Sequence, residues 1–359
     1  MNKKDSLNLI TALSDAYGAS GFEYDVVNVL RKYVKDYGEV KEDSLHNLFV
    51  ERKGNTSKNP KILLDAHTDE VSFMVKAIRD NGNLDFIVLG GIVSWDIPAH
   101  KVLVRNKDGE YIPGVIASTP PHFLSEAQRK TPPEVENMSI DIGALSRDDA
   151  INNYGIRIGE PAVPEVSFTY DEKHDRMIGK AFDCRLGCAC IVKTLDELKD
   201  EKSLGIDVVA GFSVQEEVGT RGATVTANTV SPDVAIVFEG CPADDTVVAE
   251  YASQTKIAHG PMLRYIDRNM ITNPRYQRFA LDLAEEKEIP AQGGVRTGGS
   301  TNGAPIHLSN HGVPVIVIGV PVRYIHTHYG IATYNDVENS SKLAVEVIKA
   351  LNADIISNF

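Results

Sequence analysis

Apolar residues follow two kinds of spacing along this chain. In residues 6–17 and 23–37 they recur at the interval of an amphipathic helix, and GASGF separates the two helices. Later helices are expected in CRLGCACIVKTLDELKD, RYQRFALDLAEEKE and NDVENSSKLAVEVIKALNADII. Buried strands are expected in the apolar runs PKILLDAH, GIDVVAGFSV, DVAIVFE and VPVIVIGV, and EVKEDSLHNLFVERKG has the pattern of a strand pair. Strands that alternate with helices predict a layered α/β fold.

The pattern changes between residues 72 and 166. Short β-like runs such as VSFMVKAIRD and KVLVRNKDGEYIPGVIAS are broken there by NGN, KDG and several prolines. This spacing is typical of a small β-barrel or sandwich. The expected fold class is therefore an α/β mixed-sheet core with helices on both faces (residues 1–71 and 167–359). A small β-barrel-like domain (72–166) is inserted into it.

Composition narrows the classes of partner. The 359 residues carry a formal net charge of -13, which argues against nucleic acid or an anionic membrane as the main partner. MNKKDSLNLITALSDAYG lacks the continuous apolar run of a signal peptide, and no later stretch has the ~20 apolar residues of a membrane span. The cytoplasm is the expected location. Four cysteines in a chain of this length do not indicate a disulfide framework.

Residues that can bind metals stand at or just past the ends of the predicted strands. These residues are His67, Asp69, Glu216, Glu217, Glu239 and His326, and a further acid, Asp183, precedes a predicted helix. In open α/β sheets, catalytic groups gather outside the carboxyl ends of strands. Dinuclear hydrolysis needs two cations roughly 3.5–4 Å apart, a bridging carboxylate and a second carboxylate that takes a proton from water. The pattern therefore predicts one polar site of the two-metal hydrolase type.

Taken singly, these signals leave alternatives open. An H-x-D sequence and the Glu216–Glu217 pair also suit a solvated turn, and His328 is a rival of His326 as a ligand. A separate thiolate site is disfavoured because Cys190 points largely away from Cys188 on their helix. GGVRTGGSTNGA lacks the Gly-Lys-Ser/Thr ending of a phosphate loop.

Several motifs, in order over nearly the whole chain, carry a family resemblance. DAHTDEV, AFDCRLG, VQEEVGTRGA, VFEG and VRYIH before NDVE, with GASGFE near the start, resemble the glutamyl and deblocking aminopeptidases. Those enzymes are dinuclear metallopeptidases of the tetrahedral aminopeptidase type. The resemblance implies an α/β peptidase core whose inserted domain mediates dimerisation and higher assembly. It also implies two divalent metal ions per subunit, with zinc or cobalt expected, and a homo-oligomer that forms dimers or a tetrahedral dodecamer.

The resemblance also implies roles for single residues. Asp183 would bridge the two metals, His67 and Glu239 would hold one of them, and Glu217 and His326 would hold the other. Asp69 would orient His67, and Glu216 would be the general base.

The chain departs from the commonest form of these motifs. Glu239 stands where many relatives have Asp, and Cys184 and Asn302 replace acids that are usual there. His328 stands where proline is more common. The Cys184 and Asn302 changes remove negative charge near the site, so they bear on metal affinity and substrate preference.

The predicted function is a metal-dependent aminopeptidase that removes residues from the amino terminus of short peptides, with Glu216 activating a metal-bridging water. One alternative is a related metal amidohydrolase or carboxypeptidase, in which Arg296 or Arg323 would bind a substrate carboxylate. The other is a metal-free assembly or binding protein of the same fold. The sequence does not decide the preferred terminal residue, the native metal or the size of the oligomer.

Overall fold

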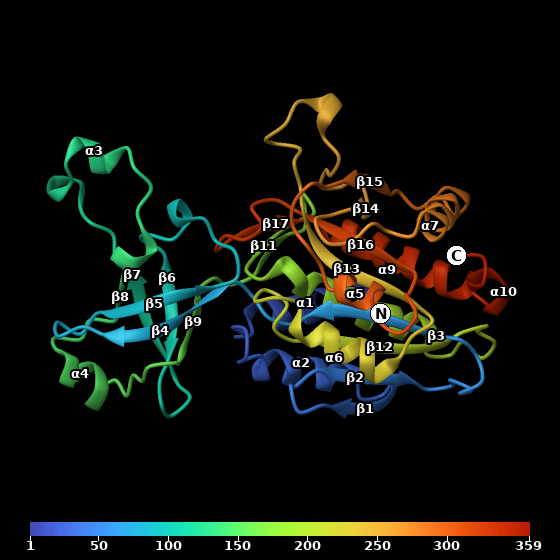
Figure 1. Ribbon diagram of the computed structural model, residues 1–359, viewed down its shortest axis with the longest axis horizontal. Coiled ribbons are helices and arrows are strands. Elements are labelled where there is room, and N and C mark those ends of the chain that lie inside the picture. Colours follow the sequence, from blue (N-terminus) through green and yellow to red (C-terminus); the bar gives the residue numbers. More distant parts are fainter.

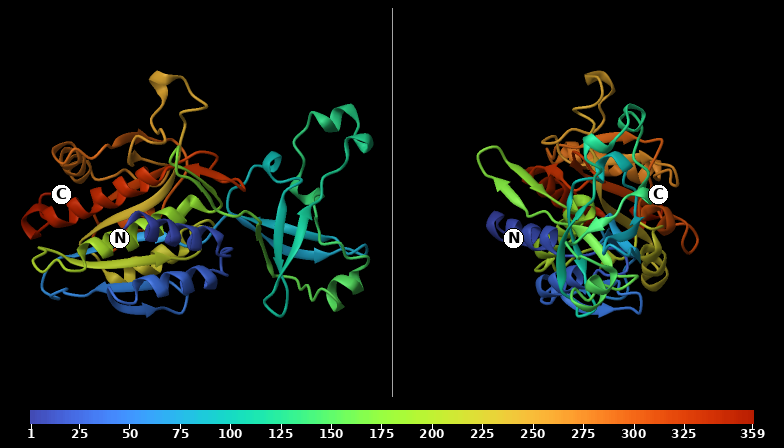
Figure 2. Two further views of the ribbon diagram at one scale, coloured as in Figure 1. Left: turned by 180° about the vertical axis from the view of Figure 1, so that it is seen from behind. Right: turned by 90° about the vertical axis from the view of Figure 1, so that its left-hand side faces the viewer.

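The computed structural model describes residues 1–359, except for the side chain of Pro121. Figure 1 shows a larger α/β lobe and a smaller β lobe side by side. The left view of Figure 2 shows the same division, with both chain termini on the larger lobe. No helix among the described residues is long and apolar enough to cross a membrane.

The larger lobe is built on an eight-stranded mixed sheet. Its strands, in their order across the sheet, are β1 (Gly38–Glu42), β2 (Leu48–Arg52), β12 (Asp207–Ser213), β3 (Lys61–His67), β13 (Val234–Pro242), β16 (Val315–Val322), β14 (Met262–Ile266) and β15 (Gln292–Val295). β12, β3, β13 and β16 are parallel neighbours, whereas β2 and β14 pair antiparallel with the outer members of this group. The four central strands thus end at one edge of the sheet.

Helices cover both faces of this sheet, which confirms the predicted mixed α/β fold. One face packs on the helices α1 (Lys3–Asp15), α2 (Tyr24–Val34), α5 (Phe182–Leu198), α7 (Pro274–Glu286) and α9 (Tyr334–Ala350). The other face packs on α6 (Arg221–Val230) and α8 (Gly303–His307). The central strands are buried on both faces, and this explains their unbroken apolar runs.

The smaller lobe is a closed barrel with its own apolar core. Its strands are β4 (Ser72–Ile78), β5 (Leu84–Leu89), β8 (Ile140–Asp141), β7 (Tyr111–Ile116), β6 (Lys101–Arg105) and β9 (Pro161–Pro164). Short helices α3 (Glu126–Arg129) and α4 (Arg147–Asn152) lie in its connections. A separate three-stranded sheet is formed by β10 (Thr169–Asp171), β11 (Arg176–Gly179) and β17 (Gly330–Ala332).

Some element boundaries differ from the sequence expectation. β13 continues three residues past Glu239 because residues 240–242 keep pairing with β16. The closing helix ends at Ala350, and a separate short helix, α10 (Ala353–Ile356), follows. In α5, Asp183 and Cys184 have non-helical backbone angles, so the regular helix begins at Arg185.

Candidate metal centre

The predicted site residues meet at the carboxyl edge of the four parallel strands. His67 is the last residue of β3 and Glu239 lies near the end of β13. Glu216 and Glu217 follow β12, and His326 follows β16. Because β12, β3, β13 and β16 are adjacent in this order, residues far apart in the sequence are brought side by side.

Asp183 lies between the two histidines and offers one carboxylate oxygen to each. Its Oδ1 is 3.2 Å from Nε2 of His67, and its Oδ2 is 3.3 Å from Nε2 of His326. A carboxylate in this position can bridge two cations, one on the side of each imidazole.

A second carboxylate accompanies each histidine. Glu239 Oε1 lies 3.3 Å from His67 Nε2, and Glu217 Oε2 lies 3.8 Å from His326 Nε2. Glu216 Oε2 is slightly further from the first imidazole, at 3.9 Å from His67 Nε2. Donor atoms of these residues fall into three overlapping groups, each spanning less than 4.8 Å. All five predicted metal ligands are therefore close together.

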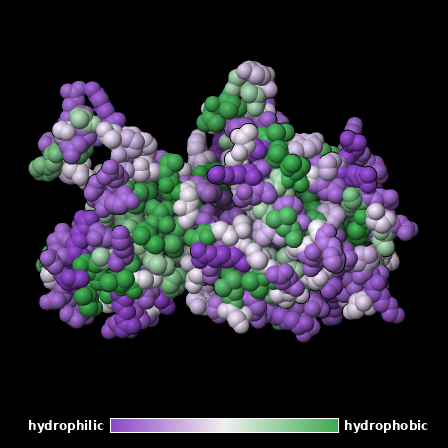
Figure 3. All heavy atoms as spheres, in the orientation of Figure 1, coloured by the Kyte–Doolittle hydropathy of each residue, from purple (hydrophilic) through white to green (hydrophobic). Residues whose placement is uncertain are grey.

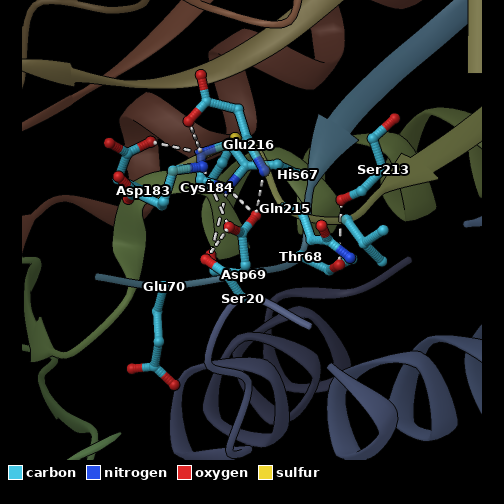
Figure 4. A network of polar contacts seen from close by, with 12 residues as sticks. Ser20, His67, Thr68, Asp69, Glu70, Asp183, Cys184, Ser213, Gln215 and Glu216 are labelled. Atoms are coloured by element: carbon cyan, nitrogen blue, oxygen red, sulfur yellow. Dashed lines mark hydrogen bonds and ion pairs between the residues drawn. The ribbon is translucent and has the colours of Figure 1, made fainter. Parts of the chain in front are cut away.

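Asp69 lies behind His67 and contacts several parts of the site, as Figure 4 shows. Its Oδ1 is 3.3 Å from Nδ1 of His67 and also accepts the backbone N–H of Glu216 at 2.8 Å. Its Oδ2 accepts the backbone N–H of Glu217 at 3.1 Å and the hydroxyl of Ser20 at 2.6 Å. Asp69 thus connects the orientation of one imidazole to the position of the Glu216–Glu217 turn.

Burial and mutual repulsion shift the pKa values of the acids. Burial raises the pKa of Glu216 to about 7, and the charge of Asp183 adds to this shift. Burial also raises the pKa of Glu217 to about 8 and, with Asp183, that of Glu239 well above its ordinary value. Burial would raise the pKa of Asp183 as well, but His326 and His67 hold it well below its usual range. Such opposed shifts in one cluster are typical of functional sites.

The donor set fits divalent cations. Imidazole nitrogens and carboxylate oxygens are the usual ligands of catalytic zinc and of related metals. Glu239 Oε2 is buried and has no hydrogen-bond partner among the described residues. An orphaned buried carboxylate oxygen is costly, and a cation would satisfy it.

A cavity of about 540 Å³ opens onto this cluster. Where the cavity meets the candidate metal ligands, it is lined by Glu216, Glu217, Glu239 and His326. Arg264 and Arg296 also line the cavity. The cavity can hold the end of a short peptide beside the candidate metal ligands.

The residues that depart from the common motif lie in or near the candidate metal centre or the barrel. Cys184 is buried, its Sγ falls within one of the donor groups, and it donates to the carbonyl of Phe238. Asn302 donates to Asp65 at 2.7 Å. His328 is buried and stacks on His100 with ring centroids 4.0 Å apart. All four cysteines are free.

Three contributors to the site escaped the sequence reasoning. The carbonyl oxygen of Gly91 lies 2.7 Å from Nδ1 of His326. Glu23 is buried and accepts the backbone N–H of Gln215 at 3.0 Å, beside the Ser20–Asp69 contact described above. Ser20 and Glu23 belong to the GASGFE motif, which carried the resemblance without a role, whereas no local signal pointed to Gly91.

Comparison with known proteins shows the family to which the chain is similar. The family model described as M42 glutamyl aminopeptidase matches residues 46–343. The glutamyl aminopeptidase of Lactococcus lactis subsp. cremoris (strain MG1363) is 32% identical over 351 residues, with 97% of each chain covered. The solved TET aminopeptidase of the marine sediment archaeon Thaumarchaeota archaeon SCGC AB-539-E09 superposes with a TM-score of 0.94, at 38% identity and with 99% of each chain covered.

A second solved relative bears on assembly. The TET1 peptidase of Pyrococcus horikoshii, described as able to assemble into a tetrahedron or a large octahedral shell, has a TM-score of 0.86 to this chain. It is 27% identical, and the match covers 96% of this chain and 100% of that one.

Proposed function

This chain belongs to the M42 glutamyl aminopeptidase family, and on that premise we propose that it hydrolyses the N-terminal bond of short peptides with two divalent cations. It is an aminopeptidase that uses a divalent metal. The observation that carries the two-cation proposal is the split of Asp183, whose two oxygens face different histidines. His67 and Glu239 would hold one cation, and His326 and Glu217 the other. Zinc or cobalt suits this mixed nitrogen and oxygen set.

When bound, the cations would polarise the scissile carbonyl and make an attacking water more acidic. Glu216 is the proposed general base, because its carboxylate borders the cavity without being nearest to either imidazole. It would take the proton from the water and pass it to the leaving amine. Burial raises the pKa of Glu216, so its protonated form is more stable here than it would be in water. This suits a group that must both accept and release a proton.

Asp69 is proposed as a positioning residue. It holds the His67 ring from behind and holds Glu216 through the backbone, so one carboxylate would control both the ligand and the base. The neighbouring carboxylates provide acceptors for a free α-amino group at the substrate terminus, which would direct cleavage to the first peptide bond.

The structure disfavours the carboxypeptidase alternative. Arg296 is bonded to Asp244 at 3.0 Å, and Arg323 is bonded to Asp245 at 2.7 Å. The sequence offered these two arginines as anchors for a substrate carboxylate. Each guanidinium group is instead neutralised by an aspartate of the same chain.

We also propose that residues 72–166 act as a domain that joins subunits into dimers and larger assemblies. The P. horikoshii relative is described as able to assemble into a tetrahedron or a large octahedral shell, which supports assembly of this chain. Apolar residues gather on parts of this lobe in Figure 3. Large apolar side chains of this segment are exposed: Val93, Trp95, Phe123, Leu145 and Ile158. Large exposed apolar side chains can be buried in contacts with further copies.

The test compares matched peptides with free and N-acetylated amino termini, before and after the metal is removed by a chelator. We expect release of the first residue only from the free peptide, loss of that release with the chelator, and recovery when zinc or cobalt is added back. Cleavage of the acetylated peptide at a comparable rate would contradict an aminopeptidase. Full activity after complete metal removal would contradict the metal-dependent mechanism.

A further inference from the structure

Beneath the candidate metal centre lies a buried ion cluster to which the proposed mechanism assigns no role. Glu70, Lys180 and Arg185 are 1%, 2% and 1% exposed. Lys180 Nζ lies 2.6 and 2.8 Å from the two carboxylate oxygens of Glu70, and Arg185 Nη2 lies 3.3 Å from one of them. Figure 4 shows the side chain of Glu70 directed away from His67, toward the N-terminal helices. These groups therefore do not serve as metal ligands.

The cluster joins the two segments that carry the central donors. Glu70 ends the short segment 68–70 that directly follows His67, and Lys180 and Arg185 flank Asp183 on either side in the sequence. Arg185 Nε also donates to the carbonyl of Thr68 at 2.7 Å, inside that same segment. The ion cluster therefore binds the segment after β3 to the start of α5, close to where His67 and Asp183 lie 3.2 Å apart.

We propose that Glu70, Lys180 and Arg185 form an ion clamp that positions His67 against Asp183 and so sets the affinity of the centre for its metal. This inference rests on the proposed function, which makes these two residues ligands. The clamp residues are positioning residues, because they touch neither the cavity nor the reacting atoms.

The clamp also includes the N-terminal segment. Arg185 Nη1 donates to the carbonyl of Leu13 at 2.7 Å, and Lys180 Nζ donates to that of Ala16 at 2.9 Å. These carbonyls lie at the C-terminal end of α1, where a helix leaves acceptors unpaired and carries partial negative charge. They help to balance two buried cations against a single carboxylate. Residues 13–16 precede residues 46–343, the stretch that the family model matches. Part of the hydrogen bonding to the two buried cations therefore comes from residues outside that stretch.

Stability alone explains such a cluster poorly. Removing charges from water costs about as much as their attraction returns, and apolar replacements of buried ion groups are often neutral or stabilising. Directional bonds from two cations to five acceptor atoms hold three backbone segments in one register, which apolar packing does with less precision. Partners behind metal ligands typically change metal affinity by about 10–100-fold when mutated.

The test compares Lys180→Met with Lys193→Met. Lys193 is a matched control because it is also buried, contacts Glu338 at 2.9 Å, and lies further along α5, away from the metal centre. Zinc is titrated into each metal-free protein against a competing chelator, and the free energy of unfolding is measured without metal. We expect zinc affinity to fall about 10–100-fold in Lys180→Met. It should stay at the wild-type value in Lys193→Met. Unchanged affinity in Lys180→Met, or an equal loss in both variants, would overturn the clamp.

If Lys180→Met does not fold, the variant Gly18→Ala tests the ion clamp instead. A methyl group added at Gly18 would lie 2.5 Å from Arg185 Nη2 and 2.7 Å from Val26 Cγ2, so Gly18→Ala crowds the guanidinium while keeping every charge. We expect it to weaken zinc binding, and wild-type affinity would count against the clamp. Failure of the wild-type protein to bind either zinc or cobalt would instead refute the proposed function, so the two failures are distinguishable.

Discussion

Gly91 accepts a hydrogen bond from His326, and this contact connects the two lobes at the metal centre. The Nδ1 of His326 lies 2.7 Å from the Gly91 carbonyl oxygen. A carbonyl can only accept, so Nδ1 donates its proton to Gly91, and Nε2, 3.3 Å from Asp183 Oδ2, is the nitrogen left to face a cation. Gly91 follows β5 of the barrel, whereas His326 follows β16 of the core sheet. The inserted segment therefore completes the centre in addition to any role in assembly.

Replacing Gly91 should disturb this histidine without removing any donor. A methyl group at Gly91 would lie 3.3 Å from Nδ1 of His326, which is tight enough to force a small shift. We expect Gly91→Ala to weaken metal binding by about tenfold, the lower end for loss of a ligand's supporting partner. Metal titration checks this, with Gly298→Ala as the control, because a methyl group there meets no atom within 4 Å. Equal affinities in the two variants would contradict the role of Gly91.

Gly240→Ala should have a larger effect. A methyl group at Gly240 would lie 2.7 Å from both Cα and Cβ of Asp183, and backbone atoms cannot swing aside as a flexible side chain can. The carboxylate of Asp183 must then move away from at least one histidine. We expect loss of at least one metal ion per subunit, measured by elemental analysis, and a corresponding loss of turnover. Full occupancy in this variant would show that Asp183 need not keep its position.

Glu216→Gln should separate catalysis from metal binding. The amide keeps the size of the side chain but cannot accept a proton, so we expect turnover to fall about 10²–10⁴-fold, as for the loss of a general base. The metal content should stay near the wild-type value. Glu217→Gln is the contrasting variant, because it alters a proposed ligand and should lose metal. Near-normal turnover of Glu216→Gln on an aminoacyl anilide would remove Glu216 from the role of base.

His328 should make the folded protein sensitive to acid. Burial, together with the neighbouring His100, lowers the pKa of His328 to about 3 from its ordinary value of 6.5. As pH falls below 6.5, the unfolded chain takes up a proton at this position and the folded chain does not, so stability falls. At pH 5 the contribution amounts to about 2 kcal/mol.

The measurement for His328 is a difference between two proteins. His328→Phe keeps an aromatic ring against His100 and removes the titrating group. Denaturant unfolding at pH 7.5 and pH 5 should show a smaller loss of stability in the variant than in the wild type. Parallel losses in the two proteins would mean that His328 is protonated in the folded state without cost.

The helices and strands with a strong local pattern of apolar residues were predicted from the sequence. The apolar runs of β3, β12, β13 and β16 and the periodicity of α1, α2, α5, α7 and α9 were sufficient to find these elements. Helix α6 was missed because RGATVTANTV is rich in β-branched residues, and the structure gives it no side-chain N-cap. The short strands β14 and β15 were missed as well, since their sequences MLRYI and QGGV have no strong alternation.

The sequence by itself determined which candidate donor residues the chain offers and that they stand near strand ends, because both depend on residue identity and short-range periodicity. It did not determine that the two oxygens of Asp183 face different imidazoles, or that Gly91 orients His326. Nor did it reveal that Glu70 meets Lys180, a residue 110 positions away in the chain. Tertiary structure alone decided these contacts, because the order of the strands in the sheet and the docking of the barrel bring distant segments together, and no local spacing encodes that order.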